Sequence, residues 1–192
     1  MSTPRNGGRR ANALRRELVV RVDESSGAPA EVVYDVLTDL RTHLEWGGRM
    51  QPKETYRLLS MRAPDGSAGV GTEFETTGAD AMGVFADTSV VTEAQRPTLF
   101  EFVTEAQLST KNGALAVWTN VHRYEIDPRG NGCRIAYTIR TVRISELPGA
   151  LRAFNVPGLR SLLLTVGRSN VRRGLRNLVR MAEELAGVRP AG

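Results

Sequence analysis

The stretch "APAEVVYDVLTDLRTHLEW", residues 28–46, decides the fold. Pro29 and Glu31 stand in its first helical turn, where a fixed φ and a negative charge both favour the start of a helix. Apolar residues then recur at the i, i+3, i+4, i+7 spacing, at Val33, Val36, Leu37 and Leu40. This spacing predicts an amphipathic helix with one buried face.

A second and shorter helical piece is predicted for residues 41–46. It ends on a large aromatic residue, Trp46, directly before Gly47 and Gly48. We expect Trp46 to anchor this corner and the two glycines to release the chain into a loop. His43 is expected at the surface or rim of the corner.

The chain on either side of this stretch alternates with period two, which is typical of strands. Residues 17–25 predict one strand, and six further strand-like segments follow between 52 and 145. Turn signals such as Asp65-Gly66 and Asn131-Gly132 separate these segments at hairpin spacing. Short connections favour an antiparallel meander, so a sheet of seven antiparallel strands is predicted.

A long helix is predicted from about Leu159 to Leu185, which is about 40 Å at ~1.5 Å per residue. Its expected buried stripe comprises Val171, Leu175, Leu178, Ala182 and Leu185. With all helices on one side, the sheet must curve around the long helix. The sequence therefore predicts an α+β fold with two short helices after the first strand and a space left between sheet and long helix.

Length and composition are those of one domain, with 192 residues of which 41% are hydrophobic. We expect a flexible basic tail at 1–13, a domain at 14–186 and a short tail at 187–192. The single Cys133 excludes an internal disulfide. Neither a membrane span nor a signal peptide is recognisable, so a cytoplasmic location is expected. Two Lys against 24 Arg are typical of a GC-rich genome, and a bacterial source is expected.

The last predicted helix carries arginines at a spacing of four, at Arg168, Arg172, Arg176 and Arg180, with Arg173 beside them. Such a stripe offers contacts to nucleic-acid phosphates, but no aromatic residues are interleaved with it. Arginine stems also commonly cover the apolar flanks of a helix. Nucleic acid is therefore the less favoured partner. A peripheral membrane contact through the apolar segment 153–164 stays open.

The order of elements resembles the START-like superfamily of polyketide cyclase/dehydrase and lipid-transport proteins (SRPBCC). Further motifs that carry the resemblance are "GVGTEFE" (69–75), "RPTLFEF" (96–102) and "YEIDPRGNGCRIAY" (124–137). The resemblance extends over about residues 14–186. It implies a helix-grip fold with an internal site for a small hydrophobic molecule. It does not imply one activity, because carriers, cyclases, ring-hydroxylase subunits and regulators share this fold.

Strand alternation predicts which side chains face the long helix. The inward set is mostly aromatic with a few polar groups: Phe74, Phe100, Phe102, Trp118, Asn120, His122, Tyr124 and Tyr137. Phe85 and Asp87 lie in a segment whose two faces are not separated by pattern. Such a set suits a flat or branched apolar ligand with one or two oxygens. The predicted ligand-binding residues are this set together with Phe85 and Trp46.

Two functions follow from this set. The first is a carrier or sensor of an aromatic, polyketide-like or lipid-like molecule, acting as a monomer or homodimer. The second is an aromatase/cyclase or dehydrase in which His122 acts as acid or base, Tyr137 or Tyr124 as donor and Asp87 as the group that orients them. Motifs for a metal or cofactor, such as HExxH, GxSxG or a phosphate loop, are not recognisable, so none is expected.

Overall fold

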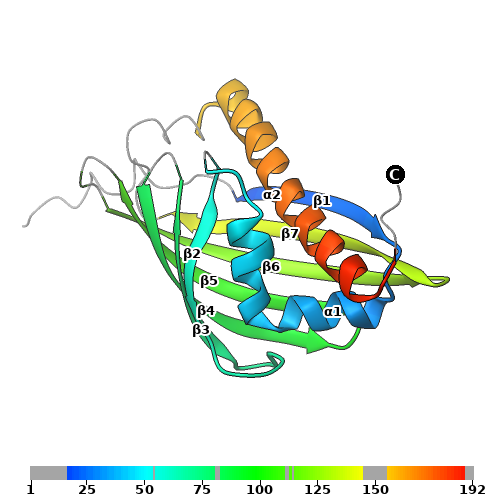
Figure 1. Ribbon diagram of the computed structural model, residues 1–192. Coiled ribbons are helices and arrows are strands. Elements are labelled where there is room, and N and C mark those ends of the chain that lie inside the picture. The colour runs from blue at the N-terminus through cyan, green and yellow to red at the C-terminus, as the bar shows by residue number, and fades with distance from the viewer. Residues whose placement is uncertain are drawn as a thin grey trace, which may run out of the picture.

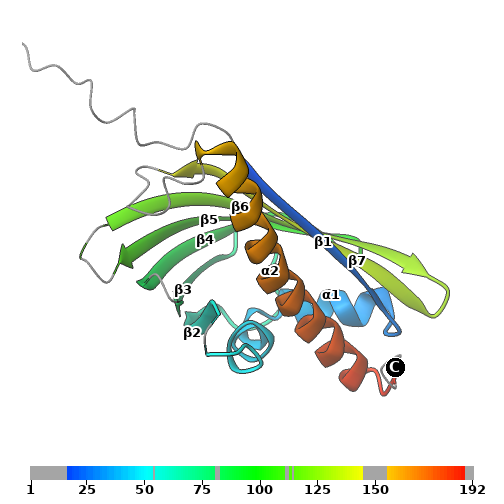
Figure 2. The same ribbon diagram turned by 90° about the horizontal axis from the view of Figure 1, so that it is seen from above.

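The computed structural model describes residues 17–53, 55–80, 83–110, 113, 115–144 and 155–188. A curved antiparallel sheet of seven strands, in the order β1-β7-β6-β5-β4-β3-β2, holds all described helices on its concave side (Figures 1 and 2). The predicted α+β helix-grip fold is thereby confirmed. The expected tail at 1–13 and residues 189–192 of the expected tail at 187–192 lie outside the described residues.

The strands follow the predicted meander, and the first strand closes the order by pairing with the last. Their bounds are β1 Leu18–Ser26, β2 Arg57–Arg62, β3 Glu73–Ala79, β4 Gly83–Gln95, β5 Leu99–Thr110, β6 Leu115–Arg129 and β7 Gly132–Ile144. Register shifts interrupt three of the pairings, at Leu58/Ser60, Val91/Glu93 and Thr119/Asn120. Bulges of this kind bend the strands and raise their twist, which supports the curvature of the sheet.

The helical stretch after β1 contains three pieces. Helix α1 (Ala30–Thr38) is followed by a 3-10 turn, η2 (Leu40–Thr42), and by a π turn, η3 (Glu45–Arg49). The predicted helical piece at 41–46 is therefore split, and Gly47 and Gly48 lie inside η3 instead of ending it. A side chain at Gly48 would meet the carbonyl oxygen of Leu58 at 2.8 Å, so only glycine lets β2 approach this closely.

The prediction for His43 was wrong, because the residue is only 4% exposed. Its Nε2 donates a hydrogen bond to the carbonyl oxygen of Leu37 at 2.8 Å, and its ring packs on Trp46 with centroids 4.5 Å apart. Burial lowers the pKa of His43 to about 4. The indole of Trp46 in turn donates to Thr42. Trp46 anchors the corner as expected, and a neutral His43 is part of that anchor.

Helix α2 (Pro157–Leu185) buries its second half. Leu175, Leu178 and Ala182 are buried as predicted, but Leu185 is 66% exposed. Glu183 takes the last buried place, because its Oε1 accepts hydrogen bonds from the backbone amide of Gly27 and from the hydroxyl of Ser26 at the end of β1. The end of the helix therefore meets a polar turn that needs an acceptor.

Buried Asn177 fixes the second half of α2 to the π turn by donating to the carbonyl oxygens of Trp46 and Met50. The first half lies over the open part of the sheet, with Leu159 49% exposed, and Figure 2 shows α2 crossing the concave side obliquely. Among the described residues, no helix combines the length and apolarity that a transmembrane span requires.

Candidate functional site

The concave face of the sheet carries two closely packed apolar clusters. The larger one lies under the second half of α2 and includes Trp46, Phe74 and Phe100. The smaller one comprises Leu18, Phe85, Leu108, Ala116 and Ile144, with Leu164 of α2 packed against it. Polar and aromatic side chains of β6 and β7 lie on the same face, and these are only half-buried: Trp118, Asn120, His122 and Tyr137.

Every residue of the predicted inward set lies on this concave face. The structure also settles the orientation of β4, which the sequence pattern left open. Phe85 is buried while the neighbouring Val84 is 52% exposed, so Phe85 and Asp87 both point inward. Trp46, Phe74 and Phe100 are buried members of the larger apolar cluster. Their direct contact with a ligand stays a prediction.

Four inward rings form one pile across β5, β6 and β7. Phe102 stacks on His122 with centroids 4.6 Å apart and an interplanar angle of 11°. Tyr124 and Tyr137 are direct cross-strand partners and stack at 4.2 Å and 3°. The imidazole of His122 is nearly parallel to the Tyr137 ring as well, at 15°. Phe102 and Tyr124 are buried in this pile, whereas the half-buried rings of His122 and Tyr137 offer a flat surface to another planar apolar molecule.

A short hydrogen bond fixes the imidazole of His122. Nδ1 lies 2.6 Å from the hydroxyl oxygen of Tyr137. Burial lowers the pKa of His122 to about 3, so the ring is neutral at pH 7. A phenol is a stronger hydrogen-bond donor than a neutral imidazole, and the imidazole nitrogen is the better acceptor, so the Tyr137 proton goes to Nδ1. The remaining ring proton is therefore on Nε2, which has no protein partner among the described residues.

Asn120 also offers hydrogen-bond donors on the concave face. Its Oδ1 accepts a hydrogen bond from the Thr141 hydroxyl at 2.8 Å, so the side chain retains its amide N–H groups for another partner. In the neighbouring strand pair, Ser89 and Thr104 satisfy each other at 2.8 Å. The middle of the concave face thus presents donors, from Asn120 and from Nε2 of His122, next to aromatic surface.

Asp87 lies further along the concave face, toward the smaller cluster. Its Oδ2 accepts hydrogen bonds from Tyr56 at 3.3 Å and from Thr76 at 3.4 Å. Burial raises the pKa of Asp87 to about 6, although both hydrogen bonds act in the opposite direction. Tyr56 rests on Gly78, where an added side chain would meet the Tyr56 hydroxyl at 2.5 Å. Burial and the adjacent Asp87 raise the pKa of Tyr56.

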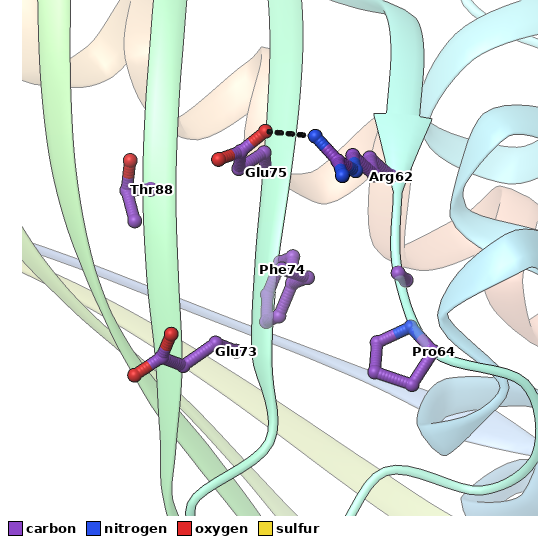
Figure 3. A pocket seen from close by; sticks show the side chains of 7 residues that line it. Arg62, Pro64, Glu73, Phe74, Glu75 and Thr88 are labelled. Atoms are coloured by element: carbon purple, nitrogen blue, oxygen red, sulfur yellow. Dashed lines mark ion pairs between the residues drawn. The ribbon is translucent and has the colours of Figure 1, made fainter.

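Two hollows on the outer face have a different character. One, of about 330 Å³, lies beside Glu75 and Arg62, whose ion pair spans 3.9 Å (Figure 3). The other, of about 370 Å³, surrounds Arg123, which pairs with Glu101 at 3.0 Å. Both are lined by solvated charges, so they do not suit an apolar ligand. Within the described ranges, no three His, Cys, Asp or Glu side chains gather as a metal site.

Two arginines of the predicted stripe on α2 form ion pairs within the protein. Arg172 and Arg176 both bind the carboxylate of Glu24 on β1, at 2.6 and 3.0 Å. These two guanidinium groups attach α2 to the edge strand of the sheet. Their role in the fold weakens the case for a continuous phosphate-binding surface.

A curved antiparallel sheet that holds a long helix over a half-open aromatic face defines the helix-grip class of proteins. Residues 17–183 match the sequence model of the family described as polyketide cyclase / dehydrase and lipid transport. The chain belongs to this family. No curated protein sequence matches it.

Solved structures share the fold at low sequence identity. A protein from Thermus thermophilus is 19% identical with a TM-score of 0.61, covering 88% of this chain and 99% of that one. A conserved protein from Geobacillus kaustophilus is 11% identical with a TM-score of 0.63, covering 87% and 96%. A Mycobacterium smegmatis protein is 16% identical with a TM-score of 0.52, covering 88% and 92%. At these identities the likeness concerns the fold alone.

Proposed function

We propose that the chain binds a small hydrophobic molecule on the concave face, between the sheet and α2, as a carrier or sensor. The observation that carries the proposal is the relay from Tyr137 to His122, in which the Tyr137 hydroxyl binds Nδ1 and Nε2–H of the neutral imidazole lies beside stacked rings. Because His122 is only half-buried, this N–H can donate to a molecule that enters beside the rings.

The donor set indicates the chemistry of the ligand. The N–H groups of His122 and Asn120 require acceptors, so the ligand carries a carbonyl or similar oxygen at this position. The stacked rings of Phe102 and the two tyrosines favour a planar apolar body. An aromatic polyketide combines both properties, and so does a neutral lipid with an unsaturated or cyclic part.

Native mass spectrometry of the purified protein tests whether an apolar molecule accompanies it. In parallel, titration with anthraquinone, which is planar and bears two carbonyl oxygens, is followed by tryptophan fluorescence. We expect His122→Phe, which retains a ring but loses the donor, to weaken binding about tenfold, the value of one buried hydrogen bond. Thr119→Val on the outer face of the same strand is the matched control. A protein that carries no molecule and binds no probe would refute the proposal.

Catalysis is the second candidate function, and the observation in its favour is Asp87. A carboxyl group with a pKa of about 6 suits general acid–base work near neutral pH. His122, whose pKa is about 3, stays neutral there and acts as a donor instead. If turnover of a polyketide substrate is found, its rate should change with an inflection near pH 6 that Asp87→Asn abolishes. A profile that keeps this inflection in the variant would exclude Asp87 as the acid or base.

A further inference from the structure

Two polar atoms on the concave face are buried without any hydrogen-bond partner among the described residues. They are Oδ1 of Asp87 and Nε1 of Trp118. Oδ2, the other carboxylate oxygen of Asp87, accepts hydrogen bonds from Tyr56 and Thr76. Of this carboxylate, only Oδ1 is therefore unpaired within the described part of the chain. An unpaired buried polar atom costs about 1–3 kcal/mol, and proteins seldom contain one without a functional reason.

The two residues belong to the same row of the sheet. Asp87 on β4 is opposite Ala106 on β5, and Ala106 is opposite Trp118 on β6. Because the side chain of Ala106 is small, it does not fill the space between the larger side chains of Asp87 and Trp118. The indole lies edge-to-face with Phe85, which also belongs to β4, at a centroid distance of 6.4 Å. Trp118 therefore leans across β5 toward the strand that carries Asp87.

Neighbouring residues fix both groups in place. Tyr56, which binds Asp87, packs edge-to-face on Phe85 at 5.4 Å, so one set of rings supports both polar groups. Leu164, in the first half of α2, packs against the same cluster. The pair is thus an acceptor and a donor held on rigid strands, beside an apolar cluster that Leu164 of α2 also contacts.

We propose that Asp87 and Trp118 together anchor a hydroxyl group of the hydrophobic ligand, with Oδ1 accepting its proton and Nε1–H donating to its oxygen. This inference rests on the proposed function and specifies its ligand. A hydroxyl is one group that donates and accepts at once, which matches the two unpaired atoms. The ligand then places a hydroxyl at Asp87 and an acceptor oxygen near His122.

Other polar groups fit this pair less well. An ammonium group would pair with Asp87, but it has no acceptor for the indole N–H and would meet the positive edge of that ring. A carboxylate would accept from Trp118 but would be repelled by Asp87. A methyl ether offers an acceptor and no donor. A bound water fits as well as a hydroxyl, and a test must distinguish the two.

The test uses three probes of similar shape: naphthol, naphthyl methyl ether and naphthylmethylammonium. Binding is measured by titration calorimetry at pH 7.5, and the indole N–H resonances are followed by nitrogen-15 correlation spectra. The chain has only two tryptophans, so Trp118→Phe assigns its resonance. Asp87→Ala and Trp118→Phe remove one partner each. Thr88→Val, on the exposed side of the same strand as Asp87, is the matched control.

We expect naphthol to bind about tenfold more tightly than its methyl ether and to shift the Trp118 resonance downfield. Asp87→Ala should reduce this preference to about onefold. Trp118→Phe should weaken the binding of naphthol and of the ether alike, whereas Thr88→Val should change neither. Equal binding of naphthol and ether would overturn the anchor while leaving the binding function intact, and a water-filled pair would give this result. Tightest binding of the ammonium probe would also overturn it. If none of the probes binds, the proposed function fails with it. Amide spectra establish that each variant is folded.

Discussion

Asp87→Asn should stabilise the protein at neutral pH, although it removes a hydrogen-bonded charge. The free carboxyl group has a pKa near 3.8, and burial raises the pKa of Asp87 to about 6. The folded state therefore binds the proton more tightly than the unfolded state does. The free energy of unfolding therefore falls as pH rises above 3.8, and this loss is complete above about 6.

The magnitude follows from the shift of about two units. At ~1.4 kcal/mol per unit, the ionised Asp87 costs the folded state about 3 kcal/mol, and partial solvent exposure reduces this to about 2 kcal/mol. Asparagine has nearly the same shape and keeps an acceptor for Tyr56 and Thr76, but it does not ionise. The variant should therefore be more stable than the original by about 2 kcal/mol at pH 8 and by about zero below pH 4.

Urea unfolding of both proteins between pH 4 and pH 8 measures this difference. Changes common to the two chains, such as those from His43 and His122, cancel at each pH. Asp65→Asn is the matched control, because that side chain is 95% exposed and its replacement should give no such trend. A stability difference that stays constant with pH, or an Asp87→Asn protein that is the less stable one at pH 8, would refute the reasoning.

Three further changes probe the corner and the relay. His43→Ala removes the bond to Leu37 and leaves a cavity, so it should cost about 3 kcal/mol in urea unfolding, and an unchanged midpoint would contradict this. Asn177→Ala frees two carbonyl oxygens and should cost about 2 kcal/mol, with no rescue by Asp, which cannot donate; thermal melting measures it. Tyr137→Phe should abolish the preference of His122 for the Nε2–H form; long-range nitrogen-15 spectra that show the same tautomer in both proteins would exclude the relay.

Much of the fold was predictable because it depends on local patterns. Period-two alternation and turn residues predict the strands, and the pattern of Val33 and Leu37 predicts α1. The inward faces of β5, β6 and β7 follow from the same alternation, since their outward positions carry charges. The pattern failed on β4, where Val84 is exposed while Asp87 faces inward. Hydrophobicity no longer marks the buried face when a site requires polar groups inside.

Other features could not be read from the chain because they depend on which groups the folded chain brings into contact. His43 looks like a surface residue until the carbonyl oxygen of Leu37 and the Trp46 ring enclose it. The exposure of Leu185 follows from Glu183 meeting the turn at Gly27. In each case a polar side chain is buried, against the prediction from the sequence pattern, because a neighbouring segment supplies or needs a hydrogen bond.

The sequence by itself determined the order of the elements, the curved sheet around a long helix and the identity of the inward side chains, because backbone periodicity and turn chemistry act locally. Only the tertiary structure decided what those side chains do. The proton on Nε2 of His122 depends on Tyr137, which lies on the neighbouring strand. The unpaired atoms of Asp87 and Trp118 depend on the register across β5. Hydrogen bonding and burial depend on which groups are neighbours in space, and the folding of the chain brings these groups together.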